Sequence, residues 1–348
     1  MYTLAIGAVC DERRHDLRHN LRRHYARHVA SGELLVRFVV SDDRLHDQRW
    51  RAREVAANGS TGAVDDLLFV PATVRSTMLE TADCPGHEPG TRRCWSSRTP
   101  YREAHCAHKT MGWWQVAGRW PARWYGKTDD DALIDMPALL FMLRAVLAPI
   151  GGAIYGGIVH YSSLNTTNLE GACFSSGGNS AARYKRRYCP TADMAGPYPY
   201  VEGPLEILAP ETQRFLAQRA ARDPRMRCHY EDLYVGVELS AHPSLRLVNL
   251  ERLLGRKDIY VPGRREYIGA DGLLAHWVRS QQAYERVAAD FERKRALHAA
   301  AGGGAQRITR EMSDGRALAL RVLEQQLAGT VGAELCGVEP KTSRGLLA

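Results

Sequence analysis

Three adjacent aspartates, Asp129, Asp130 and Asp131, are the residues whose types and spacing point most directly to chemistry. They follow closely on a run over residues 122–127 that has the pattern of a buried strand. Hard divalent cations such as Mg²⁺ and Mn²⁺ take oxygen ligands, and alternate carboxylates after a strand can present them on one side of a turn. The alternative is structural: Asp131 or a neighbour caps a helix that begins near Met136, and the other carboxylates are solvated.

A second pair of acids, Glu231 and Asp232, opens the stretch EDLYVGVELSAH. The spacing of Leu233, Val237 and Leu239 turns these apolar residues toward a core, so we expect the acids at a helix N-terminus. The helix dipole stabilises negative charge there, which needs no function. A carboxylate fixed on a rigid element can also act as a general base. The residues alone leave both interpretations open.

Two further motifs are weaker. Tyr198 and Tyr200 flank Pro199 and could form a platform for a sugar ring, although packing is the more frequent use of such tyrosines. His276 stands beside Trp277, a setting more typical of a core histidine than of a ligand.

The pattern of elements predicts an α/β domain with a mostly parallel sheet, because apolar runs alternate with helical spacing. The expected strands cover residues 3–9, 34–40, 66–71 and 122–127, and the expected helices cover 14–29, 46–57 and 106–118. Ligands of such sheets bind at the carboxyl ends of the strands, where the three aspartates are expected to lie. We expect one domain over 1–280 with an insertion loop at 80–105, followed by a helical C-terminal extension over 281–348.

The bulk composition narrows the class of partner. The chain has 348 residues, a net charge of +8 and a pI near 9.1, which favours anionic partners. No run of about 18 apolar residues is present, which excludes a membrane-spanning helix from the sequence as given. The eight cysteines include no C-x-x-C pair, which argues against a structural zinc ribbon.

A basic stretch near the N-terminus raises the alternative of a nucleic-acid-binding protein. Arg14, Arg18 and Arg22 are spaced by four and would share one helical face. Leucines make the same helix amphipathic, and no base-stacking motif accompanies it, so we expect a solvated basic face. The histidine pairs 15/19 and 24/28 have metal-ligand spacing but no evident carboxylate or cysteine partner, and we expect them at the surface.

Taken in order, several segments resemble the β-1,3-galactosyltransferase family of inverting glycosyltransferases, which includes β-1,3-N-acetylglucosaminyltransferases. The stretch YGKTDDDALID resembles the family's K-T-D-D-D-V-F-V-N, and YEDLYVGVEL resembles E-D-V-Y-V-G. YPYVEGPLEIL resembles Y-P-x-Y-x-x-G-x-x-Y-x-L, with Ile207 where Tyr is usual. Weaker matches are AHKTMGWW, RRHDLRHNL without the family's Trp, and an acidic segment matched only by Glu54 and DDLLFVPATVRST. The matches span residues 3–280.

The resemblance implies a GT-A fold, a UDP-sugar donor and dependence on Mn²⁺ or Mg²⁺. On this resemblance Asp129 and Asp131 match the metal-binding D-x-D, and Asp130 would face the sugar or ribose of the donor. His276 would complete the ligand set of the metal, and Asp232 matches the catalytic base.

The implied reaction moves a hexose, galactose or N-acetylglucosamine, from a UDP-sugar to a hydroxyl of a glycan acceptor in β-1,3 linkage. Inversion needs one base, unlike hydrolases with two carboxylates, and a divalent ion neutralises the departing diphosphate. Basic side chains such as Lys127, Arg186 or Arg187 could add electrostatic support. Tyr198, Tyr200 and Glu231 are the candidates for contact with the acceptor. By resemblance we expect protein glycosylation in the Golgi lumen and a membrane anchor. The sequence as given shows neither a signal nor an anchor, so a cytoplasmic location stays open.

Three alternatives remain beside this hypothesis. The first is the basic nucleic-acid-binding protein described above. A metal-dependent phosphohydrolase would also use clustered aspartates, but we find no second cluster of ligands in the sequence. A GT-A protein that binds carbohydrate without catalysis would keep the fold, although the retained Asp129, Asp131 and Asp232 argue against it.

Overall fold

The structure is a computed structural model in which the described residues are 1–9, 14–42, 47–58, 65–70, 99–165, 194–222, 231–254, 257–258 and 272–300. Within helix α3 the side chains of residues 99–107 are not described. The two cysteines of the predicted insertion loop, Cys84 and Cys94, lie outside the described residues, as do Arg186 and Arg187.

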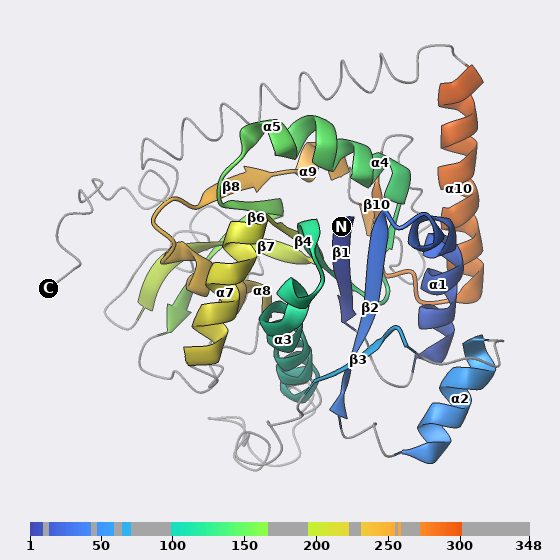
Figure 1. The fold of residues 1–348 in the computed structure, drawn as a ribbon, viewed down its shortest axis with the longest axis horizontal. Helices are drawn as coiled ribbons and strands as arrows, with labels where there is room; N and C mark the ends of the chain where they lie inside the picture. The colour runs from blue at the N-terminus through green and yellow to red at the C-terminus, as the bar shows by residue number, and fades with distance from the viewer. Residues whose placement is uncertain are drawn as a thin grey trace, which may run out of the picture.

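A seven-stranded sheet forms the centre of the fold, in the order β3-β2-β1-β4-β7-β6-β8 (Figure 1). Its strands are β1 (Tyr2–Val9), β2 (Leu34–Ser41), β3 (Leu67–Val70), β4 (Ala122–Asp129), β6 (Ile154–Asn165), β7 (Met194–Leu208) and β8 (Arg246–Asn249). Strands β1 to β4 pair in parallel, as does β6 with β8, whereas β7 pairs antiparallel with both neighbours. The predicted α/β class with a mostly parallel sheet is confirmed.

A second, three-stranded sheet lies beyond the turn that follows β4. It has the order β5-β10-β9, from β5 (Leu133–Ile134), β10 (Leu274–His276) and β9 (Lys257–Asp258). Strand β10 pairs antiparallel with β5, so the chain near residue 275 returns to the segment just after the three aspartates. This pairing brings His276 to the end of β4.

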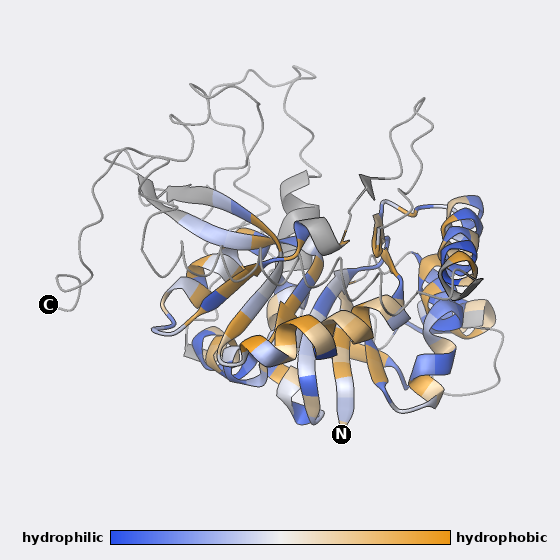
Figure 2. Ribbon diagram, turned by 90° about the horizontal axis from the view of Figure 1, so that it is seen from above, coloured by the Kyte–Doolittle hydropathy of each residue, from blue (hydrophilic) through white to orange (hydrophobic). Residues whose placement is uncertain are grey.

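Helices cover both faces of the large sheet (Figure 1). One core lies between the sheet and α3 (Thr99–Val116), α7 (Pro210–Arg222) and α8 (Glu231–Ser240), and is built around Trp113 and Trp114. The other core includes side chains of α1 (His15–Ala30), α2 (Gln48–Asn58), α4 (Met136–Met142), η3 (Leu143–Leu147), α9 (Glu251–Leu254) and α10 (Gln281–Ala300). The short helices η2 (Ala117–Arg119) and α5 (Ala148–Ile150) complete the set of helices within the described residues. Apolar residues follow the strands between the two helical layers (Figure 2).

One boundary differs from the prediction. Helix α3 begins at Thr99, so the last residues of the expected loop 80–105 are helical. The expected C-terminal extension is helical over 281–300, where α10 buries Tyr284, Val287 and Phe291 in the core, and the domain boundary at 280 stays a prediction. Residues 301–348 lie outside the described part of the chain.

The basic face of α1 points inward, contrary to the expectation of a solvated face. Arg18 is fully buried and donates to both carboxylate oxygens of Glu54 at 3.1 and 3.0 Å. Arg22 lies 2.8 Å from Glu54 and donates to Asp66 at 2.7 Å. The carboxylate of Glu54, itself fully buried on α2, therefore holds α1 to α2.

Replacing Glu54 should reveal this interaction as a loss of stability. Burial alone would raise the pKa of Glu54, but the guanidinium of Arg18, with help from His15 and Arg22, lowers it to about 2. A carboxylate with a lowered pKa stabilises the fold above its unfolded value of 4.5, and this contribution is lost as pH falls toward about 2. Glu54→Gln leaves Arg18 buried without its counter-ion, so we expect a loss of about 3 kcal/mol at neutral pH.

Urea denaturation at several pH values measures this prediction. Glu292→Gln is the control, since Glu292 forms an exposed pair with Arg295 on α10 and should cost less than about 1 kcal/mol. The difference between Glu54→Gln and the wild type should shrink as pH falls below 4.5. A loss that is small at neutral pH, or that does not change with pH, would contradict the assignment.

Candidate metal and carboxylate site

The three aspartates lie at the carboxyl end of β4, in the middle of the large sheet. Asp129 is the last residue of β4 and pairs with Val9 at the end of β1. The turn is fixed by its backbone, because the N–H of Asp130 donates to Val9 and that of Ala132 donates to Asp129, both at 3.2 Å. The aspartates are therefore not a solvated turn: Asp130 and Asp131 are 7% and 5% exposed.

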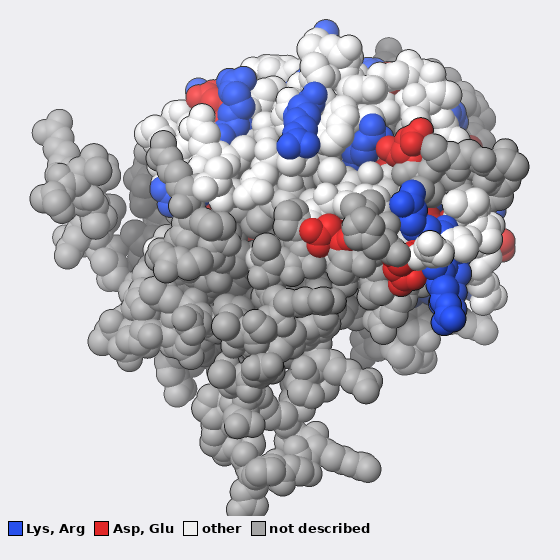
Figure 3. All heavy atoms as spheres, turned by 60° about the horizontal axis from the view of Figure 1, so that its bottom comes forward, with Lys and Arg blue, Asp and Glu red and all other residues white. Residues whose placement is uncertain are grey.

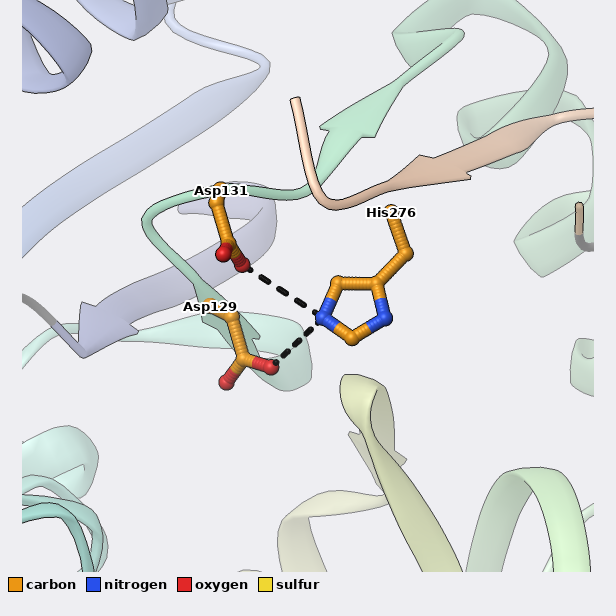
Figure 4. Close-up of side chains that lie close together, drawn as sticks. All are labelled: Asp129, Asp131 and His276. Carbon is orange, nitrogen blue, oxygen red and sulfur yellow. Dashed lines mark ion pairs between the residues drawn. The ribbon is translucent and has the colours of Figure 1, made fainter. Parts of the chain in front are cut away.

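Asp129, Asp131 and His276 converge on one point (Figure 4). Nε2 of His276 lies 3.4 Å from Oδ2 of Asp129 and 3.4 Å from Oδ1 of Asp131. One ligand atom from each residue lies within 4.8 Å of the others. Two carboxylate oxygens and one imidazole nitrogen are a donor set that suits a hard or borderline divalent ion such as Mn²⁺ or Mg²⁺, so the residues fit the metal that the sequence pattern predicts.

The outer oxygens of the same two carboxylates are held by cationic side chains. Nζ of Lys127 donates to Oδ1 of Asp129 at 2.9 Å, and Nε of Arg279 donates to Oδ2 of Asp131 at 2.6 Å. Each carboxylate thus keeps one oxygen toward His276 and the other toward a cation. Burial alone would raise the pKa values of both aspartates, but Lys127 lowers that of Asp129 and His276 lowers that of Asp131. Both carboxylates are therefore ready to bind a cation.

Lys127 is a fully buried cation at the centre of this site. It lies two residues before Asp129 on β4 and therefore on the same face of the strand. Its ammonium also donates to Oε1 of Glu231 at 2.5 Å and to the carbonyl oxygen of Gly203 at 3.1 Å. Burial alone would lower its pKa, but the surrounding carboxylates raise it well above its usual value. Lys127 therefore remains charged and links the end of β4 to α8.

Glu206 is a further buried acid beside Lys127, which it faces across the β4–β7 pair. Its Oε1 lies 3.9 Å from the ammonium, and its Oε2 accepts a hydrogen bond from the hydroxyl of Tyr155 at 3.3 Å. Burial raises the pKa of Glu206 well above its usual value. A neutral Glu206 limits the negative charge that one lysine has to balance.

Glu231 and Asp232 begin α8, as predicted, and face the same cluster. Oδ2 of Asp232 accepts a hydrogen bond from the backbone N–H of Gly203 at 2.8 Å, and its Oδ1 lies 3.8 Å from Nζ of Lys127. Among the described residues, Oδ1 of Asp232 and Oε2 of Glu231 have no hydrogen-bond partner. Burial raises the pKa of Asp232 to about 7. The site therefore has a carboxylate oxygen able to accept a proton near neutral pH.

Gly203 is required by the close approach of these groups. A Cβ atom at this position would lie 2.8 Å from Oδ1 of Asp232 and 2.9 Å from Nζ of Lys127. Gly203 and Pro204 lie within β7, where the carbonyl oxygen of Gly203 accepts from Lys127, its N–H donates to Asp232, and the hydroxyl of Thr128 donates to the carbonyl oxygen of Pro204 at 2.8 Å.

The two candidate acceptor tyrosines, Tyr198 and Tyr200, lie on β7 and are partly buried against the core beneath α8. The ring of Tyr200 lies 5.8 Å from that of His160 on β6. Both tyrosines pack against the core that includes α8, and their contact with an acceptor stays a prediction.

Two expectations about basic residues and histidines are wrong. The arginines expected on a solvated face are paired with acids: Arg18 and Arg22 as described above, and Arg14 with Asp130 and Asp131 at 3.9 and 3.7 Å. On the face shown in Figure 3, described basic side chains are separated by neutral and acidic surface. The shared face of three arginines, which was the observation that favoured a nucleic-acid-binding protein, is therefore paired with acids and not free.

The histidines of α1 are not at the surface. His28 is buried, and the other three are partly buried. Nδ1 of His15 lies 2.5 Å from Oε2 of Glu54, and Nε2 of His24 lies 3.0 Å from the carbonyl oxygen of Ile134.

The sequence patterns did not identify Arg14 and Arg279 as site residues, and they suggested Lys127 only as one of several basic residues. The alternation of β4 places Lys127 on the same face as Asp129, which was a usable signal. Arg279 stands three residues after His276, but only the β5–β10 pairing shows that this segment returns to Asp131.

Comparisons with known proteins identify no family for this chain. No family model and no curated protein matches the sequence. A solved structure of the galactosyltransferase LgtC, in complex with donor and acceptor sugar analogs, is 12% identical, covers 84% of this chain and 94% of its own, and has a TM-score of 0.33. An active-site mutant of LgtC is 11% identical, covers 84% and 95%, and also has a TM-score of 0.33. At these values the alignments carry neither fold nor activity over to this chain.

Among the described helices, none is both long and apolar enough to cross a membrane.

Removing the central cation should destabilise the protein in a pH-dependent way. Lys127→Met leaves the carboxyl groups of Glu206, Glu231 and Asp232 close together without a positive partner, and we expect a loss of about 3–5 kcal/mol at pH 8. Without Lys127 the folded-state pKa values of these acids rise further above their unfolded values. The folded state then binds more protons, so the variant should regain stability as pH falls toward 5.

Thermal unfolding at pH 8 and pH 5 distinguishes this account from simple loss of packing. Lys294→Met is the control, because this lysine of α10 donates to the backbone oxygen of Gly272 at 3.2 Å and should show a small loss at both pH values. An equal loss for Lys127→Met at the two pH values would contradict the role of the ammonium as the shared counter-ion.

Proposed function

We propose that this chain is an inverting, metal-dependent GT-A glycosyltransferase that moves a hexose from a UDP-sugar to a hydroxyl of a glycan acceptor. One observation carries the proposal: a three-residue metal-binding group and a proton-accepting carboxylate lie on the two sides of one buried lysine, at the carboxyl end of the central strand. Ligands of open α/β sheets bind at this end.

The metal side of the site would be formed by Asp129, Asp131 and His276. A divalent ion bound there would neutralise the diphosphate of the donor as a Lewis acid. Asp130, buried between the two ligands and 3.9 Å from Arg14, would face the sugar or ribose of the donor. Mn²⁺ is the ion we favour, because the family that the sequence resembles uses it and because one of the three ligands is an imidazole.

Asp232 would act as the base on the acceptor hydroxyl. Its Oδ2 accepts a hydrogen bond from the N–H of Gly203, which fixes the carboxylate, while its Oδ1 is buried, has no hydrogen-bond partner among the described residues, and would take the proton of an acceptor hydroxyl that enters the site. A pKa near 7 suits a base at neutral pH, because the group is both partly ionised and basic enough to accept the proton. Glu231, with Oε1 on Lys127 and Oε2 without a partner in the described chain, would bind the acceptor.

The finer assignments rest on the sequence resemblance. The K-T-D-D-D and E-D-x-Y-V-G patterns support transfer of galactose or N-acetylglucosamine in β-1,3 linkage. The same resemblance supports protein glycosylation in the Golgi lumen, with Tyr198 and Tyr200 near the acceptor. A GT-A protein that binds carbohydrate without catalysis is the alternative, and it would form no product with or without Asp232.

Asp232→Asn should separate binding from catalysis. We expect transfer from UDP-galactose or UDP-N-acetylglucosamine to fall by about 10²–10⁴-fold, the contribution of a general base. Binding of UDP with Mn²⁺ should not change, because the metal ligands lie on the other side of Lys127. In the wild type, kcat should rise with pH through about 7, since the base must be ionised.

Two measurements check this: release of UDP in the presence of a panel of β-linked glycan acceptors, and calorimetry of UDP binding. Glu238→Gln is a control on the same helix, because Glu238 pairs with Arg219 away from the site. Loss of UDP binding in Asp232→Asn would indicate a structural role for the acid, and full activity would exclude it as the base.

A further inference from the structure

The two oxygens of the Asp131 carboxylate face different partners, a histidine on one side and two arginines on the other. Its Oδ1 faces His276 at 3.4 Å, on the side of the metal-binding group. Its Oδ2 accepts a hydrogen bond from Arg279 at 2.6 Å and lies 3.7 Å from Nη1 of Arg14. The two arginines therefore neutralise the same carboxylate that would bind a divalent ion.

The segment 276–279 contacts Asp131 through two of its side chains and through its backbone. Trp277 has a φ of 64°, a left-handed conformation that a tryptophan seldom adopts. The N–H of Val278 donates to the backbone oxygen of Asp131 at 2.8 Å. This turn lets both His276 and Arg279 contact one carboxylate, and backbone strain of this kind is held in place where a site needs it.

The ion pair between Asp131 and Arg279 joins a buried carboxylate to a half-exposed guanidinium, so the arginine is the partner that can move. The side chain of Asp131 is 6% exposed, whereas that of Arg279 is 44% exposed, so the guanidinium lies at the open side of the carboxylate. It also lies 5.5 Å from the centre of the Trp277 ring, which can hold the cation as it turns away. Arginine has a planar fork of donors that matches the oxygens of a phosphate.

A divalent ion at Oδ1 of Asp131 would take over the neutralisation of that carboxylate. The attraction between Asp131 and Arg279 would then weaken, because the aspartate and the ion together no longer carry a net negative charge. The freed guanidinium would remain within one side-chain length of the metal-binding group, where an anionic ligand of the metal must lie.

We propose that Arg279, assisted by Arg14, is the counter-ion of Asp131 in the metal-free protein and moves to the diphosphate of the nucleotide when a divalent ion binds. This inference rests on the proposed function. It makes Arg279 a positioning residue that couples the two ligands: the ion frees the arginine for the diphosphate, and the diphosphate removes the competitor of the ion. By linkage, each ligand must strengthen binding of the other by the same factor.

Arg279→Gln tests the proposal because the two affinities should change in opposite directions. Without the competing guanidinium, Mn²⁺ alone should bind several-fold more tightly than to the wild type. With saturating Mn²⁺, UDP should bind at least about tenfold more weakly, because a charge-assisted bidentate contact is lost. Arg279→Lys should restore part of the UDP affinity, and Arg14→Gln should give smaller changes with the same signs.

Arg219→Gln is a matched control. Arg219 on α7 is 40% exposed and pairs with Glu238 at 2.6 Å, the same distance as in the Arg279 pair, but away from the aspartates. It should leave both affinities unchanged. Calorimetric titrations of Mn²⁺ alone, and of UDP at saturating Mn²⁺, measure the two quantities on each protein.

The outcomes separate the inference from the proposed function. If Arg279→Gln weakens Mn²⁺ and UDP together, the arginine merely supports the fold of the site and the exchange is wrong. If neither affinity changes while the wild type binds both ligands, Arg279 has no part in binding, although the proposed function survives. If the folded wild type binds neither Mn²⁺ nor UDP, both proposals fail.

Discussion

The site depends on the buried ammonium of Lys127. Four carboxyl groups surround it, from Asp129, Glu206, Glu231 and Asp232, and it is fully buried. Acids gathered this closely away from water would repel one another or take up protons, so their positions require a resident cation. One lysine on β4 thereby holds Asp129 and the acids of α8 together, so that two segments far apart in the chain form one site.

Arginine side chains neutralise further buried acids beyond the four around Lys127. Arg14 and Arg279 neutralise Asp131, while Arg18 and Arg22 neutralise Glu54 on α2. Arg14, Arg18 and Arg22 thus pair with acids inside the fold and do not form the solvated basic face that the sequence suggested, whereas Arg23 and Arg27 of α1 are exposed. What remains at the carboxyl end of β4 is a group of two carboxylates and one imidazole that could hold a metal ion, with lysine and arginine side chains beside it.

Much of this could be predicted from the sequence, because apolar runs and local spacing are local properties. The strands around β1, β2 and β4, the turn of aspartates and the acids at the start of α8 follow from such patterns. Local patterns do not show the return of His276, because it depends on the pairing of β10 with β5, and only the family resemblance indicated it. The inward face of α1 could not be predicted either, because its partners Glu54 and Asp66 come from other parts of the chain, and a helix pattern cannot show which face meets them.

The central claim is that the aspartates hold a metal for a nucleotide. The most direct test is calorimetric titration of UDP into the purified protein with Mn²⁺ and then with EDTA, repeated with Asp131→Asn. The account predicts binding only with the metal, and loss of that binding in the variant, whose side chain keeps its shape but not its charge. Equal affinity in EDTA, or no binding to folded protein in either condition, would contradict the claim.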